Sequence, residues 1–189
     1  MNDKTRNMVM TAMMTAMICV LAPISLPIGP VPVSLGTLAI FITVYVLGMS
    51  KSVIAIVIYL LLGLAGVPVF SGFSAGPAKL AGPTGGYLIG YIPMVLIAGA
   101  VIDRYYKNRI VSALGMIAAT VVLYGIGTGY LAFSAGMTFG AALMAGVVPF
   151  IIPDMVKIAA SAIIGPVLKE RLAKAGVIGP VGEGQIKNG

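Results

Sequence analysis

Charged residues are spaced so far apart along this chain that most of it must lie in a membrane. Four charge-free runs cover most of the 189 residues, namely 7–50, 52–78, 80–102 and 110–153. Charged residues make up 9% of the chain and apolar residues 59%, whereas soluble domains carry about 25% charged residues. A membrane-spanning helix needs about 20 predominantly apolar residues. The sequence therefore predicts an all-α, polytopic membrane protein that forms one domain over residues 1–189.

Breaks within the two longest charge-free runs divide the chain into six predicted spans. The segment PISLPIGPVP, residues 23–32, carries four prolines and cannot continue a helix. FSAGMTFG, residues 133–140, divides the second long run. Residues 139–148 are too short to span and should form a helical lead-in, and 176–189 should be a flexible tail. The first helix resembles a signal peptide but is expected to be retained, because no Ala-x-Ala cleavage site follows it. The predicted helices are 5–22, 35–49, 52–67, 85–103, 110–132 and 149–173.

The basic residues predict the orientation of this six-helix bundle. Cytoplasmic loops of membrane proteins carry an excess of Lys and Arg. If the N-terminus is cytoplasmic, ten of the twelve basic residues lie on the cytoplasmic side, and the reverse orientation places these ten outside. Both termini are therefore predicted to be cytoplasmic, with Lys79 in an outer loop and Lys157 inside the membrane. The ten are Lys4, Arg6, Lys51, Arg104, Lys107, Arg109, Lys169, Arg171, Lys174 and Lys187.

The last span contains two ionisable residues, Asp154 and Lys157. Only residues 158–168 are free of charge between Lys157 and Lys169, so a span of sufficient length must include the pair. At about 1.5 Å rise per residue, the pair lies roughly 7–12 Å below the outer membrane edge. One interpretation is a buried ion pair that holds helices together, although such pairs contribute little net stability. The other is a polar ligand site, because intramembrane charges usually mark a pathway or a binding site.

Three irregular segments should meet the pair on the outer side. They are residues 29–35, 67–87 and 149–157, and the second is rich in glycine. Long irregular loops in compact proteins are often functional, and glycine lets a backbone approach a ligand closely. The same residues are also what a simple chain reversal requires. Tyr87 and Tyr91 begin the helix after the glycine-rich turn, and Tyr87 is the preferred candidate for a pocket wall.

Two patterns of small residues indicate helix packing. Ala12 and Ala16 stand four residues apart among methionines in the first helix, which suits close approach of another helix in the bundle or in a partner. GIGTG, residues 125–129, is spaced like a nucleotide-binding fingerprint. It lies in the middle of a predicted span with no preceding strand, so it is interpreted as a helix-packing surface.

The residue types that are missing argue against catalysis. The chain has no histidine and no P-loop sequence, and Asp154 is the one acid placed in the membrane. No pair of carboxylates and no nucleophile with a base can be assembled there. We therefore expect no enzyme activity, no metal site and no cofactor.

Four motifs, in this order, closely resemble the BioY family, the biotin-specific substrate-binding (S) components of energy-coupling factor (ECF) transporters. They are GPVPVSLGTLAIF, YLLLGLAGVPVFSGF, GPTGGYLIGY and GVVPFIIPDMVKIAASA, and the resemblance extends over about residues 5–173. Many members have Thr where Ser34 stands and Gln where Gly36 stands. Serine keeps the hydroxyl, but Gly36 offers no side chain, so no polar contact is carried onto it.

The resemblance implies high-affinity capture of biotin outside a prokaryotic cell and its uptake through the plasma membrane. The implied partners are a transmembrane coupling protein, which the Ala12 and Ala16 motif would contact, and two cytoplasmic ATPases. Asp154 would accept hydrogen bonds from the ureido N–H groups of biotin and Lys157 would donate to its carbonyl. Candidates for covering the apolar body and binding the carboxylate are Val31, Val33, Ser34, Lys79, Gly85, Gly86, Tyr87, Tyr91 and Phe150.

Two other functions remain open from the sequence. The chain could be a stand-alone secondary transporter of biotin or another small polar vitamin, with Asp154 titrating during proton coupling. It could also be a small intramembrane enzyme that acts on lipid, although no catalytic set supports this. Tight stoichiometric biotin binding, pH-driven uptake and substrate turnover would distinguish the three.

Overall fold

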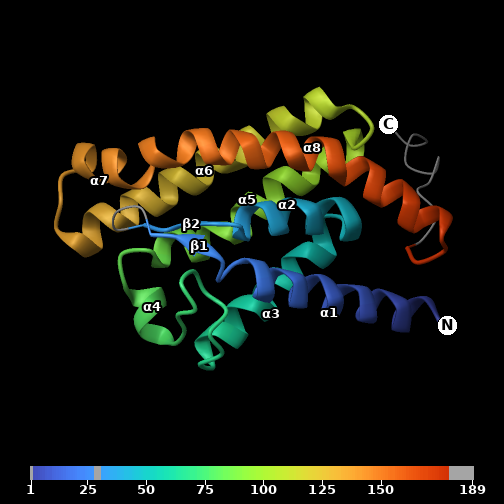
Figure 1. Ribbon diagram of the computed structural model, residues 1–189, viewed down its shortest axis with the longest axis horizontal. Helices are drawn as coiled ribbons and strands as arrows, with labels where there is room; N and C mark the ends of the chain where they lie inside the picture. The colour runs from blue at the N-terminus through green and yellow to red at the C-terminus, as the bar shows by residue number, and fades with distance from the viewer. Residues whose placement is uncertain (1, 28–30, 179–189) are drawn as a thin grey trace.

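The computed structural model describes residues 2–27 and 31–178, and nearly all of them belong to helices (Figure 1). The described part does not include residues 28–30 of the proline-rich segment. It also does not include residues 179–189 of the predicted tail, among them Lys187. The elements, in chain order, are α1 (Asp3–Leu21), β1 (Ser25–Leu26), β2 (Val33–Ser34), α2 (Gly36–Leu47), α3 (Met49–Leu64), α4 (Pro77–Ala81), α5 (Gly85–Tyr105), α6 (Arg109–Ala135), α7 (Phe139–Gly146), the short 3-10 helix η1 (Val148–Phe150) and α8 (Ile151–Lys174).

Three helical stretches are long and apolar enough to cross a membrane. They are Gly85–Tyr105, Arg109–Ala135 and Phe139–Lys174, the last combining α7, η1 and α8. Helices α2 and α3 are apolar but shorter. All residues of α2 except Leu38 are buried within the protein. Because α2 is enclosed by other helices, its length need not match the bilayer thickness of about 30 Å.

The boundary between α2 and α3 lies at Gly48 and not at Lys51, where the sequence placed it. Gly48 has a φ of 75°, a left-handed value that glycine adopts without strain. The Asp103 carboxylate, at the end of α5, accepts a hydrogen bond of 2.9 Å from the Met49 backbone N–H. This contact satisfies one of the free N–H groups at the start of α3 and joins it to α5.

Glycines let α5 and α6 pack at close range. A Cβ atom at Gly86 would collide with Tyr130, and one at Gly127 would collide with the Tyr87 ring. The packing surface predicted from GIGTG therefore rests on Gly127. A Cβ at Gly125 or at Gly129 would meet nothing within 4 Å.

The segments between the helices also carry ordered structure. The strands β1 and β2 pair as a short antiparallel hairpin, in which Ser25 pairs with Ser34 and Leu26 with Val33. The segment after α3 is anchored by Phe70, which is fully buried and packs edge-to-face on Tyr59 with ring centroids 5.6 Å apart. In Figure 1 the hairpin, α4 and α7 lie toward one end of the molecule, and the start of α1 lies at the other.

Candidate functional site

The Asp154–Lys157 ion pair lies at the start of α8 and faces the interior of the bundle. Lys157 Nζ is 2.8 Å from Asp154 Oδ1, and the two residues are 8% and 5% exposed. Residues three apart lie on one helical face, so the helix itself brings the charges together. Asp154 occupies the first turn, where the helix dipole favours a negative charge. The pair is therefore buried, as the length of the last span required.

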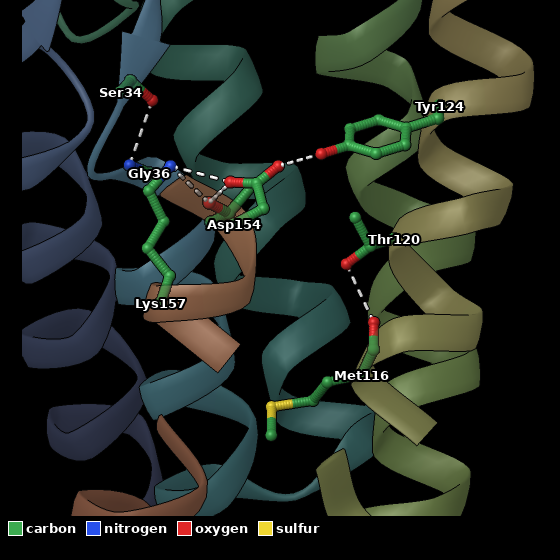
Figure 2. A network of polar contacts seen from close by, with 8 residues as sticks. Ser34, Gly36, Met116, Thr120, Tyr124, Asp154 and Lys157 are labelled. Carbon is green, nitrogen blue, oxygen red and sulfur yellow. Dashed lines mark hydrogen bonds and ion pairs between the residues drawn. The ribbon is translucent and has the colours of Figure 1, made fainter. Parts of the chain in front are cut away.

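Side chains from two other helices complete a polar network around the pair (Figure 2). The Tyr124 hydroxyl, from α6, donates to Asp154 Oδ2 over 2.6 Å. Lys157 Nζ donates to the Thr37 hydroxyl of α2 over 3.2 Å, and Thr37 Oγ1 lies 3.5 Å from Asp154 Oδ1. The network joins α2, α6 and α8 at one point inside the bundle.

This network leaves hydrogen-bonding capacity for a ligand. An ammonium group has three donors and a carboxylate has about four lone-pair sites. Lys157 uses donors on Asp154 and Thr37, and Asp154 accepts short bonds from Lys157 and Tyr124. One Lys157 donor and lone pairs on Asp154 remain. The site can therefore bind a neutral group that presents both an N–H and a carbonyl oxygen.

A cavity opens next to the network and is lined by both polar and apolar side chains. Its volume is about 50 Å³, far below the roughly 300–1,000 Å³ of pockets that enclose a small molecule. In this structure the cavity is therefore too small for a vitamin-sized ligand. Its lining consists of Val31, Pro32, Ser34, Thr37, Ser71, Thr84, Tyr87, Leu88, Tyr91, Leu123, Tyr124, Phe150, Asp154 and Lys157.

Seven of the predicted site residues line this cavity: Val31, Ser34, Tyr87, Tyr91, Phe150, Asp154 and Lys157. The hydroxyl of Tyr87 is bonded away from the ion pair, because it donates to the Gly146 carbonyl over 2.9 Å and lies 3.2 Å from the Thr128 hydroxyl. Ser34 Oγ accepts a 3.0 Å hydrogen bond from the Gly36 backbone N–H. Tyr87 therefore contributes the face of its ring to the cavity more than its polar tip.

The structure places four other predicted residues outside the cavity lining. Val33 is in β2 and packs into the hydrophobic core, because successive strand residues point to opposite faces and Ser34 faces the cavity. Lys79 lies on α4, partly exposed. A Cβ at Gly85 would collide with the Leu80 carbonyl, and one at Gly86 with Tyr130. These two glycines therefore allow close approach of protein segments to each other.

Thr37 and Tyr124 are the two members of the polar network that the sequence did not single out. Tyr124 lies 30 positions from Asp154 and Thr37 lies 117 positions away. Several tyrosines in the chain suit either a membrane interface or a pocket wall, so nothing in the pattern singled out Tyr124. A hydroxyl residue at the start of an otherwise apolar helix was the available signal for Thr37.

Ala12 and Ala16 lie on the outside of the bundle. Both are exposed, while Met14 and Thr15, between them in sequence, are buried. The exposed face of α1 also carries Met8 and Met13, which are 68% and 59% exposed. The small residues are therefore available for contact with a partner and are not used for packing inside this chain.

This chain is similar to one family of known proteins over almost its whole length. Residues 1–174 match the BioY family. A probable biotin transporter BioY of Pyrococcus horikoshii is 40% identical over 161 residues, which are 85% of this chain and 94% of that protein. The biotin transporter BioY of Thermotoga maritima is 36% identical over 165 residues, which are 87% of this chain and 96% of that protein.

A solved structure is similar in fold as well. The crystal structure of the S-component for biotin from an ECF-type ABC transporter aligns with a TM-score of 0.83 at 26% sequence identity. The alignment covers 90% of this chain and 95% of that chain. The fold of this chain is therefore that of a known membrane transport component.

Proposed function

The chain belongs to the BioY family, and we propose that it captures biotin and delivers it across the membrane as the S component of an ECF-type transporter. It is a membrane transport component and not an enzyme, and biotin is its substrate and not a cofactor. The observation that carries the proposal is the buried network of Asp154, Lys157, Tyr124 and Thr37 beside the cavity.

The network matches the ureido ring of biotin in its hydrogen-bonding groups. This ring carries two N–H donors and one carbonyl acceptor. The remaining Lys157 donor would bind the carbonyl oxygen, and the Asp154 carboxylate would accept from an N–H. Hydrogen bonds to charged groups are about twice as strong as neutral ones. Apolar side chains of the lining, such as Leu88, Leu123 and Phe150, would cover the sulfur-containing ring and the valerate chain.

The valerate carboxylate would lie at the mouth of the cavity, away from Asp154. Like charges in a buried site repel strongly, so the two carboxylates should be as far apart as the ligand allows. The hydroxyls of Ser34, Ser71 and Thr84 belong to the lining and could donate to the carboxylate. Lys79 would reach it after a movement of the segment that carries α4.

The ligand would enter from outside the cell, with both termini in the cytoplasm. Three contacts tie together the helix ends that carry most of the basic residues. Lys51 Nζ donates to Asn7 Oδ1 over 2.7 Å, the Asp103 side chain binds the start of α3, and Lys169 Nζ lies 4.8 Å from the centre of the Tyr106 ring. A basic end of this kind favours the cytoplasmic side.

Docking to the energising subunits would use the exposed face of α1. Ala12 and Ala16 leave this face flat enough for another helix to approach closely. The partner would be a transmembrane coupling protein, which connects the S component to two cytoplasmic ATPases.

Calorimetric titration of the purified protein with biotin tests the proposal, with thiamine and riboflavin as control vitamins. We expect tight one-to-one binding of biotin and no heat from either control. 2-Iminobiotin, which replaces the ureido oxygen by nitrogen, should bind more weakly because Lys157 cannot donate to a protonated guanidine group. Equal binding of biotin and 2-iminobiotin would contradict the assigned role of Lys157. Biotin uptake driven by a pH gradient, in liposomes that contain this protein and no energising subunits, would favour a stand-alone secondary transporter.

A further inference from the structure

A second, larger hollow lies on the side of the bundle, between α6, α7 and α8. Its volume is about 350 Å³, which falls in the range of small-molecule pockets. Tyr124 belongs to its lining as well as to the lining of the polar cavity. The other lining residues are Ile117, Thr120, Val121, Gly125, Thr128, Phe139, Leu143, Val147, Ile151 and Met155.

Gly125 gives this groove its depth. The residue is exposed, and a Cβ there would meet no atom within 4 Å. Neighbouring side chains on the same helix project outward, and Val121 is 62% exposed. The absence of a side chain at position 125 therefore leaves a recess next to Val121 on this surface of α6.

Among the residues that the structure describes, the side-chain hydroxyls of the lining are all bonded elsewhere, and that of Tyr124 donates to Asp154. The Thr120 hydroxyl donates to the Met116 carbonyl over 2.8 Å, and the Thr128 hydroxyl lies 3.2 Å from the Tyr87 hydroxyl. Both threonines are buried, at 4% and 1% exposure, and no charged residue belongs to the lining. A polar ligand would lose its hydrogen bonds to water here without replacement. A peptide segment would leave backbone groups unsatisfied for the same reason, unless it were helical.

The groove is continuous with the surface that faces the bilayer. Its rim includes Phe139, Ile151 and Met155, which are 57%, 46% and 38% exposed. The helices α6 and α8 that form its walls belong to stretches long and apolar enough to span a membrane. Lipid acyl chains are therefore the molecules that surround its opening.

We propose that the groove is a binding site for one acyl chain of a membrane phospholipid. The acyl chain packs against the ring of Tyr124, whose hydroxyl donates a hydrogen bond to Asp154. The site takes a linear apolar chain of a lipid whose head group remains at the interface. The inference rests on the placement of α6 and α8 in the bilayer and does not require that the polar cavity binds biotin.

Tryptophan fluorescence can test this site, because the chain has no native tryptophan. Leu143→Trp places a reporter on the rim of the groove, and Leu62→Trp places one on α3, outside the groove. Both leucines are 37% exposed in the parent, so the two reporters replace side chains of equal exposure. Each variant is solubilised in detergent and titrated with phosphatidylcholine that carries dibrominated acyl chains, which quench tryptophan on contact.

We expect saturable quenching of the Leu143→Trp fluorescence at lipid amounts that do not quench Leu62→Trp. Detergent should displace lipid from the protein surface outside the groove, so the Leu62→Trp reporter should meet few brominated chains. Identical quenching curves for the two reporters would overturn the proposal.

Two glycine variants give a matched second test in the Leu143→Trp background. Gly125→Leu fills the recess, while Gly129→Leu adds the same side chain one turn away, where a Cβ also meets nothing within 4 Å. Both changes should raise helix propensity equally. Gly125→Leu should abolish the excess quenching, and Gly129→Leu should retain it. If both variants keep the quenching, or both lose it while thermal unfolding shows them to be folded, the groove is not the lipid site.

Discussion

Removal of the charge on Asp154 should separate the role of the ion pair in stability from its role in binding. In Asp154→Asn, the amide oxygen would face Lys157 and the amide N–H₂ would face Tyr124, whose hydroxyl would then accept a hydrogen bond. The Lys157 ammonium would keep a neutral oxygen and the Thr37 hydroxyl, 3.2 Å away, as its partners. Leaving one member of a buried pair without its counter-charge typically costs about 3–5 kcal/mol. The variant should unfold at a lower temperature than the parent.

The effect of the same change on affinity is a separate quantity. Loss of a hydrogen bond to a buried charge costs about 1.5–3 kcal/mol, or roughly 10- to 150-fold in the dissociation constant for biotin. The double variant Asp154→Asn with Lys157→Met removes both charges together. It should recover most of the lost stability, because no unpaired charge remains, but it should not recover affinity.

Two measurements on the same purified samples test these expectations. Unfolding is followed by the loss of helical circular dichroism on heating. Affinity is measured by calorimetry. The reasoning is refuted if the double variant binds biotin like the parent, or if it is as unstable as Asp154→Asn. The first outcome would make the pair irrelevant to the ligand, and the second would mean that Asp154 stabilises the fold through contacts other than Lys157.

Three further predictions follow from the structure. Tyr124→Phe keeps the ring but removes the 2.6 Å hydrogen bond to Asp154, so calorimetry should show biotin affinity about 10-fold weaker, and the unfolding temperature should fall less than in Asp154→Asn because the two charges stay paired; unaltered affinity would contradict the proposed network. Ala16→Trp should leave biotin binding intact and reduce ATP-driven uptake in cells that express the complete transporter, whereas loss of binding would place α1 in the pocket. In a cysteine-free background, Lys79→Cys should react with an impermeant reagent added to intact cells and Lys107→Cys should not; the reverse pattern would invert the topology.

The spacing of charges indicates where apolar helices can lie, because burying a charge in lipid is costly wherever it occurs. The burial of Asp154 and Lys157 followed from the shortness of the uncharged stretch before Lys169. By contrast, the α2–α3 boundary depended on the backbone of Gly48, and a charge at Lys51 was a poor guide to it. Hydropathy limits where a span can be, but local backbone geometry decides where a helix ends.

The partners of the ion pair could not be predicted in the same way. Helix α2 is apolar on every side and buried on every side, so its sequence has no periodicity that shows which face Thr37 occupies. The two glycines at the start of α5 had the converse problem. Gly85 and Gly86 correctly indicate close approach of a backbone, but glycine does not specify what approaches, and here it is Leu80 and Tyr130. Contacts between helices that are far apart in the sequence depend on how each helix is rotated about its axis. This rotation cannot be read from a single sequence when a helix is apolar on every side.

The small volume of the polar cavity has a consequence for the rate of binding. A cavity of about 50 Å³ is smaller than biotin, so the surrounding segments must move apart before or after the ligand makes contact. If about 1% of molecules are open, the apparent dissociation constant is about 100-fold larger than that of the open form. The observed association rate should therefore level off at high biotin concentration, at the rate of opening. The same closure would slow escape, and a captured vitamin would stay bound for as long as the encounter with the energising subunits requires.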